Sequence, residues 1–235
     1  MTVRATRRDA GLAPRSHGGA AVRGFALLVV LALAACEPGT DPRDGGAADA
    51  ADAPVGAGRA EVRLPREPLD GAGLEVRRFA ISVAELRLVS DRGEGFDPVR
   101  TDVGTIDLAT PRTLSLAPIP PASYSAVVLR LAGSPTSVEL EVDDPEIGPV
   151  RVRYDGPLEW MARCSEGVPV GVGERLDVGV SLELDGPWED LREAELPEPI
   201  EGRIEIDARS APELGRQMVL AVGAALRAEC GTPSR

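Results

Sequence analysis

The sequence predicts an all-β fold, an antiparallel β-sandwich with one amphipathic helix packed on it near the C-terminus. Three observations predict it. Short runs of alternating apolar and polar residues recur from residue 59 onward, as in half-buried strands. Four-residue apolar spacing replaces this alternation near the C-terminus. No internal repeat is visible, and residues 59–231 are enough for one domain.

The first predicted strands are short, and one of them contains a bulge. Residues 60–64 alternate apolar and charged side chains, and residues 79–83 place their apolar side chains on one parity. Leu86 and Leu88 lie on the other parity, so a bulge near Ala84–Glu85 would return both sets to one face. Two further strands are expected at residues 106–108 and 114–116.

A central strand and a hairpin follow. Residues 124–131 are apolar on both parities apart from Arg130, which is typical of a strand covered on both faces. Next, residues 138–142 and 150–154 alternate around a predicted loop, Asp143 to Pro149. Pairing Leu140 with Val152 would set Glu139 opposite Arg153 and Glu141 opposite Arg151, and such opposite-charge pairs favour one register.

The last segments are two strands and a helix. Strands are predicted at residues 176–184 and 204–208. A helix is predicted from Ala211 to Ala228, because Ser210 and Glu213 form a capping-box pattern and apolar residues then recur at four-residue spacing.

The N-terminal segment has the pattern of a secretion signal. Five arginines precede or flank an apolar run, Phe25 to Ala35, which ends in Leu-Ala-Ala-Cys. This ending resembles a bacterial lipoprotein signal, and the resemblance implies cleavage after residue 35 and acylation of Cys36. The alternative, a transmembrane anchor, is disfavoured because a span needs about 20 apolar residues. Residues 36–58, rich in Gly, Ala, Asp and Pro, are expected to be a disordered tether.

The same resemblance implies a location. A lipoprotein is held in the cell envelope by its lipid, so its first partner is the membrane. Glu37 follows the cysteine, and the absence of aspartate there favours the outer over the inner membrane. Which face of that membrane the protein occupies is left open.

Composition excludes several kinds of chemistry. The sequence has no lysine, and its one histidine, His17, lies in the predicted signal. The mature chain therefore lacks the imidazole of Ser-His-Asp and Cys-His mechanisms and of the usual catalytic zinc sites. Residues 1–35 hold five of the 26 basic and one of the 38 acidic residues, which leaves a net charge of about −16 and disfavours nucleic-acid binding.

Two cysteines remain beyond Cys36. An oxidising compartment favours a disulfide between Cys164 and Cys230, and the alternative is two unrelated thiols.

Residues 80–131 carry a second resemblance. Ile106-Asp107-Leu108, then Ile119 to Tyr124, then Arg130-Leu131 resemble a family of uncharacterised bacterial lipoprotein domains with a prealbumin-like sandwich, of broadly immunoglobulin-like type. Ala122 stands where that family has glycine. The resemblance implies a fold and a lipoprotein setting, and it supplies no catalytic residues.

Two acidic groups are candidate sites. Asp143, Asp144 and Glu146 crowd one hairpin loop and could bind calcium, although the spacing of a known calcium loop is absent and a solvated acidic turn fits better. The acidic residues around Trp188 could form a sugar site, or the segment could be an exposed loop whose tryptophan covers the edge of the core; these residues are Asp185, Glu189 and Asp190.

Three functions follow from these observations. The first is a non-catalytic binding or assembly module of the envelope, with an unidentified protein or glycan partner and no cofactor. The second is a calcium-dependent adhesion domain that uses the acidic loops. The third is a carboxylate-based glycan hydrolase, for which the abundance of acidic residues carries no information.

Overall fold

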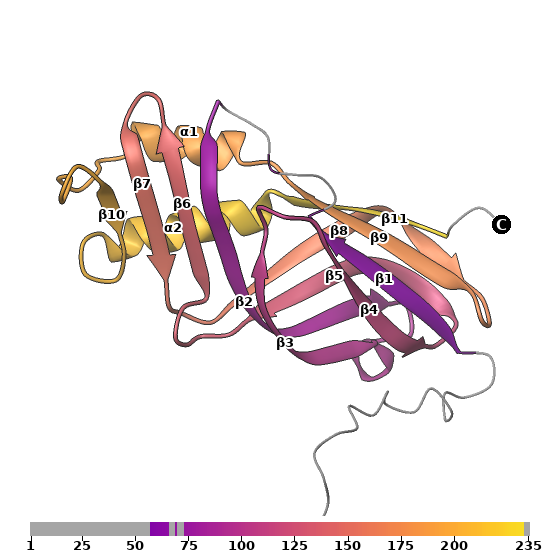
Figure 1. Ribbon diagram of the computed structural model, residues 1–235. Helices are drawn as coiled ribbons and strands as arrows, with labels where there is room; N and C mark the ends of the chain where they lie inside the picture. Colours follow the sequence, from indigo (N-terminus) through magenta and orange to yellow (C-terminus); the bar gives the residue numbers. More distant parts are fainter. Residues whose placement is uncertain (1–56, 66–68, 70–72, 233–235) are drawn as a thin grey trace, which may run out of the picture. The chain divides into compact units, whose positions relative to one another are not determined.

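The computed structural model describes residues 57–65, 69 and 73–232, which form a mixed β-sheet with two α-helices (Figure 1). The expected strand-rich fold is confirmed. Its first strands are β1 (Gly58–Leu64), β2 (Glu75–Ser90), β3 (Val99–Asp107), β4 (Arg112–Ile119), β5 (Ala122–Leu131) and β6 (Val138–Asp144). The others are β7 (Gly148–Tyr154), β8 (Leu158–Val170), β9 (Arg175–Leu182), β10 (Ile204–Ile206) and β11 (Leu226–Gly231). The helices are η1 (Glu94–Phe96, a 3-10 turn), α1 (Asp185–Glu193) and α2 (Pro212–Ala224).

The sheet is mixed, so the prediction of a wholly antiparallel sandwich is wrong. Its strands follow the order β10-β7-β6-β2-β5-β8-β11-β9-β1-β4, and β3 pairs with β2. The pairs β1–β9, β7–β10 and β8–β11 are parallel. Parallel pairing requires a long crossover, and here the long connections between these strands include both helices. A sequence pattern of alternating residues does not distinguish the two directions.

The long strand β2 joins two parts of the sheet. Residues 75–81 pair with β6, and residues 83–90 pair with β5. The register shifts between Val83 and Glu85 against both β3 and β5, which confirms the bulge expected at Ala84–Glu85. Through this bulge β2 buries both parities of its apolar residues in one core.

The hairpin of β6 and β7 has the predicted register. Glu139 lies opposite Arg153, and Glu141 lies opposite Arg151. The Arg151 guanidinium bridges both glutamates, at 2.5 Å from Glu139 and 3.1 Å from Glu141. Both strands extend into the predicted loop 143–149, so the turn is shorter than expected.

The C-terminal helix is also shorter than predicted. It ends at Ala224, and residues 226–231 form β11. Leu226 fits both helical and strand spacing. It follows Val222 by four residues, as in a helix, and it alternates with Ala228, as in a strand. Pairing of this segment with β9 and β8 decides in favour of the strand.

The predicted capping box is absent from the start of α2. The residue preceding the helix is Ala211, and no side chain caps the helix there. The Ser210 hydroxyl instead donates to the Glu205 carbonyl at 2.6 Å and accepts from the Asp207 amide. Ser210 therefore closes the turn between β10 and α2, which takes it away from Glu213.

Helix α1 replaces the loop expected around Trp188. Leu184, Trp188 and Leu191 are buried at helical spacing, but nine residues give too short a pattern to identify from sequence. The indole nitrogen of Trp188 donates to the Asp144 carboxylate on β6 and so fastens α1 to the sheet.

Strand β5 is central, as predicted, between β2 and β8, and residues 126–129 are all buried. Tyr124 lies on this strand, and its buried hydroxyl has a hydrogen-bond partner, because it donates to the Pro120 carbonyl at 2.6 Å. Burial, with smaller effects from nearby charges, raises the pKa of Tyr124 to about 12. Tyr124 is thus a structural residue.

Helix α2 packs on β8 through Trp160. The indole nitrogen of Trp160 donates to the Val219 carbonyl at 3.1 Å. A Cβ on Gly223 would lie 2.2 Å from Trp160 Cδ1, so the glycine is what lets the indole approach the helix.

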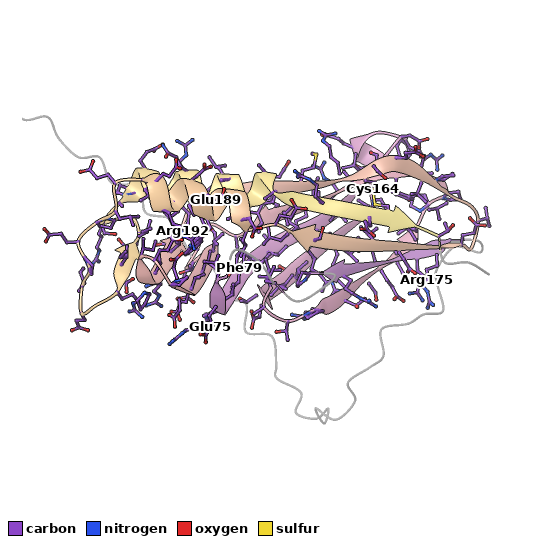
Figure 2. All side chains as sticks on the ribbon, turned by 90° about the horizontal axis from the view of Figure 1, so that it is seen from above. Glu75, Phe79, Cys164, Arg175, Glu189 and Arg192 are labelled. Atoms are coloured by element: carbon purple, nitrogen blue, oxygen red, sulfur yellow. A yellow bond between two sulfur atoms is a disulfide. The ribbon has the colours of Figure 1, made fainter. Side chains whose placement is uncertain are left out.

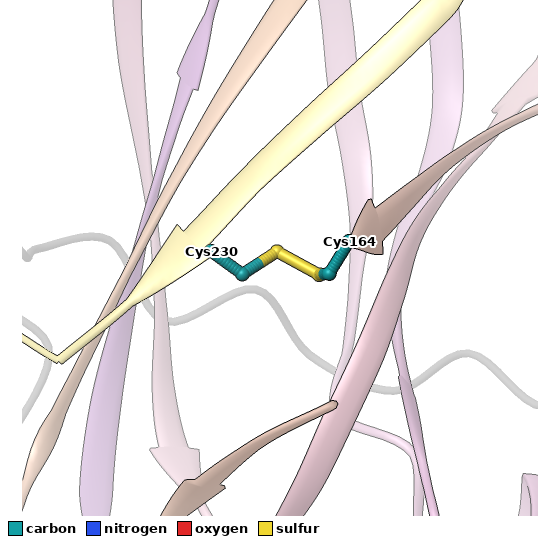
Figure 3. Close-up of a disulfide and its surroundings, with 2 residues drawn as sticks. All are labelled: Cys164 and Cys230. Carbon is teal, nitrogen blue, oxygen red and sulfur yellow. A yellow bond between two sulfur atoms is a disulfide. The ribbon is translucent and has the colours of Figure 1, made fainter. Parts of the chain in front are cut away.

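The structure contains the disulfide between Cys164 and Cys230 (Figure 3). It links β8 to β11, whose pairing is otherwise limited to Ala228 with Cys164. The disulfide therefore fastens β11, the last strand, to β8.

Candidate functional site

A polar groove of about 440 Å³ lies over the outward face of four neighbouring strands, β4, β1, β9 and β11. Apolar residues of these strands point inward, so the outward positions carry charge. The groove is lined chiefly by Glu61 and Arg63 of β1, Thr113 of β4, Arg175 and Asp177 of β9, and Glu229 of β11.

Two glycines open this face. One cross-strand row runs from Thr113 through Arg63 and Gly179 to Glu229. In the next row, Gly231 is the partner of Asp177. A glycine has no side chain, so the backbone of the sheet is exposed at these two positions. The charged side chains beside them project above the sheet and leave a hollow between them.

The Arg175 guanidinium organises the charges of the groove. Its Nη2 lies 2.7 Å from Glu61 Oε2, and its Nε lies 2.5 Å from Asp177 Oδ1. The hydrogen bond to Asp177, helped by both negative charges, raises the pKa of Arg175. Both acids thus direct an oxygen to this guanidinium, while Arg63 and Thr113 complete the polar lining.

The groove also touches the disulfide. Cys230 and Gly231 are among its lining residues, and Figure 2 shows Cys164 and Arg175 toward the same end of the sheet, away from Arg192. The crosslink to β8 therefore lies at one wall of the groove, the wall formed by β11.

The sequence did not predict that these groove residues form a site. Outward charges on residues 60–64 and 176–184 were visible as the polar half of an alternating pattern. Their convergence depends on parallel pairing of β1 with β9, across more than 100 residues of chain. The glycines at positions 179 and 231 were the one local signal, because glycine inside a strand often marks a close approach.

The predicted calcium residues have other partners. Asp143 pairs with Arg77, and Glu146 lies 3.3 Å from Arg192. Asp144 is buried, and it accepts hydrogen bonds from Trp188, from Arg192 and from two amides of its own loop. Burial opposes its ionisation, but these hydrogen bonds outweigh burial and hold the pKa of Asp144 below its usual range. The structure thus uses the loop as an ion-paired turn.

Across residues 57–65, 69 and 73–232, no group of three or more His, Cys, Asp or Glu side chains is placed to hold a metal ion.

The predicted alternative of a sugar site at Trp188 would need an exposed aromatic ring, and this segment has none. The Trp188 side chain is 0% exposed, so its ring covers the core, as the alternative interpretation of that segment had it. Glu189 and Arg192 lie on α1, toward the opposite end of the sheet from Arg175 (Figure 2).

Cys36 and the predicted signal, residues 1–35, lie outside the described residues, as does most of the tether. Among the described residues, no helix is long and apolar enough to cross a membrane.

Comparison with protein-family models, with curated proteins and with solved structures finds no match to this chain.

Proposed function

We propose that the chain is a lipid-anchored protein of the bacterial cell envelope whose β domain is a non-catalytic binding or assembly module. The groove on β4, β1, β9 and β11 is the observation that carries this proposal, because it combines a hollow with fixed charges of both signs. Its partner is an envelope protein or glycan that hydrogen-bonds with carboxylates and guanidinium groups. The prealbumin-like sandwich stays part of this proposal, resting on residues 80–131.

Several features support a binding function over catalysis. The only histidine of the sequence lies in the predicted signal. The groove's two arginines and its carboxylates form a surface for polar recognition, and Arg175 already joins two of those carboxylates. Such complementary charges give specificity more than affinity.

Acylation of Cys36 is tested by intact-mass analysis of the N-terminal peptide, with Cys36→Ala as the control. The expected result is an acylated N-terminal cysteine in the membrane fraction and a free chain for Cys36→Ala. An unmodified thiol in the wild type would contradict the lipid anchor.

The groove is tested by photo-crosslinking in cells. A photoreactive residue replaces Thr113, which is exposed at the groove, and the matched control replaces Glu159, which is exposed on β8 outside it. The expected result is a discrete adduct from position 113 that disappears when Arg63→Glu is added. Equal adducts from both positions, or an adduct indifferent to Arg63→Glu, would show that the groove is not the binding surface.

A further inference from the structure

The described chain begins at one end of the sheet, beside three loops. Gly58 pairs with Ile119 at the end of β4, and the Arg59 amide donates to the Glu174 carbonyl in the β8–β9 turn. At the same end, the Asp91 amide donates to the Ser123 carbonyl. We call this region the entry end and define it by residues 57–58, 91–98, 120–121 and 171–174 (Figure 1).

The entry end exposes two large apolar side chains. Phe96, in η1, is 60% exposed, and Val172, in the β8–β9 turn, is 69% exposed. The Arg92 guanidinium lies over the Phe96 ring, 5.4 Å from its centre. Segments that lie in a membrane–water interface combine Trp, Phe or Leu, which enter the apolar layer, with Lys or Arg, whose charged ends stay hydrated.

Most acidic groups of these loops are used internally. Asp97 accepts from the amide and hydroxyl of Ser90 at 2.7 and 2.8 Å. Asp91 accepts from the Ser123 amide, and Glu174 from the Gly171 amide. Glu94 is exposed, 3.7 Å from Arg87. Contact with a surface at this end would therefore rest on Phe96 and Val172 more than on charge.

We propose that the entry end lies on the lipid surface that holds the anchor, with Phe96 and Val172 inserted at the level of the headgroups. This inference rests on the proposed acylation of Cys36. Twenty residues separate Cys36 from Ala57, and as the flexible tether that their composition predicts they would span about 25 Å. A tether of this length keeps the entry end, where the described chain begins, within reach of the membrane.

The test uses the full acylated chain in vesicles of phosphatidylethanolamine and phosphatidylglycerol whose acyl chains carry bromine. Phe96→Trp and Val172→Trp place a fluorescent probe at the entry end. Ile200→Trp is the matched control. Ile200 is 61% exposed and lies between α1 and β10, away from the entry end. Trp160 and Trp188 are buried and contribute the same background to every variant.

The expected result is that bromine quenches the added fluorescence of Phe96→Trp and Val172→Trp at least about twofold more than that of Ile200→Trp. Similar quenching is expected without phosphatidylglycerol, because the contact is apolar. Equal quenching of all three variants would overturn the proposal.

Two further outcomes separate the alternatives. Mass analysis of the same sample reports the acyl group, so its absence overturns the anchor and this inference together, whereas acylated protein with unquenched probes overturns this inference alone. A photoreactive residue at position 96 should give lipid adducts in cells, and a discrete protein adduct in their place would assign the entry end to a protein partner.

Discussion

The Arg192 Nε lies 2.8 Å from Asp144 Oδ2, a carboxylate whose side chain is fully buried between β6 and α1. The same carboxylate accepts from the Trp188 indole and from two backbone amides. An acidic residue that the sequence predicted to lie in a solvated acidic turn, with calcium binding as the alternative, is thus the point at which a helix is fastened to the sheet.

Removing the cation should destabilise the fold strongly. Arg192→Met leaves the Asp144 charge buried without its ionic partner, and we expect the thermal midpoint to fall by about 10 °C. Arg192→Lys is the matched control, because it keeps the positive charge, and its thermal midpoint should fall less. A midpoint within about 2 °C of the wild type for Arg192→Met would contradict this account of the ion pair.

Acid should weaken this attachment. The pKa of Asp144 is lowered in the folded state, so its contribution to the free energy of unfolding is complete above its unfolded value, 3.8, and is lost as the pH falls through the lower folded value. Denaturant titrations between pH 7 and pH 2 should therefore give a shallower acid decline for Asp144→Asn than for the wild type. Parallel declines of the two proteins would show that this carboxyl is not linked to unfolding.

A single methyl group should disrupt the contact between α2 and β8. Gly223→Ala would place a Cβ 2.2 Å from Trp160 Cδ1, and the indole is held by its hydrogen bond to Val219. We expect a loss of about 3 kcal/mol in the free energy of unfolding. Gly186→Ala is the control, since a Cβ there meets open space and should cost nothing. Equal stability of the two variants in urea denaturation would refute the packing argument.

Local patterns predicted what depends on neighbours in sequence. The register of β6 and β7 followed from Glu139 and Glu141 opposite two arginines, and the bulge at Ala84–Glu85 followed from a change of apolar parity. Both features are decided by which side chains reach one core. The alternation of apolar residues and the charge pattern between them were sufficient for both.

Pairing between distant segments decided the rest. Leu226 satisfied helical and strand spacing equally, and only contact with β9 made it a strand residue. The groove formed because β1 lies parallel to β9, which sets Glu61 and Arg175 side by side. Loop acids such as Asp144 looked available for metal because the sequence does not show that Arg192 approaches them.

The crosslink should matter for the groove as well as for stability. Replacing Cys164 and Cys230 by serine opens a loop with a sequence separation of 66 and should cost about 4 kcal/mol in the chain-entropy model. Because β11 otherwise pairs with β8 only at Ala228, hydrogen exchange should accelerate first in β11. The oxidised wild type is the control. If exchange in β11 stayed as slow as in the oxidised wild type, the strand would be held by β9 alone, and the groove would not depend on the disulfide.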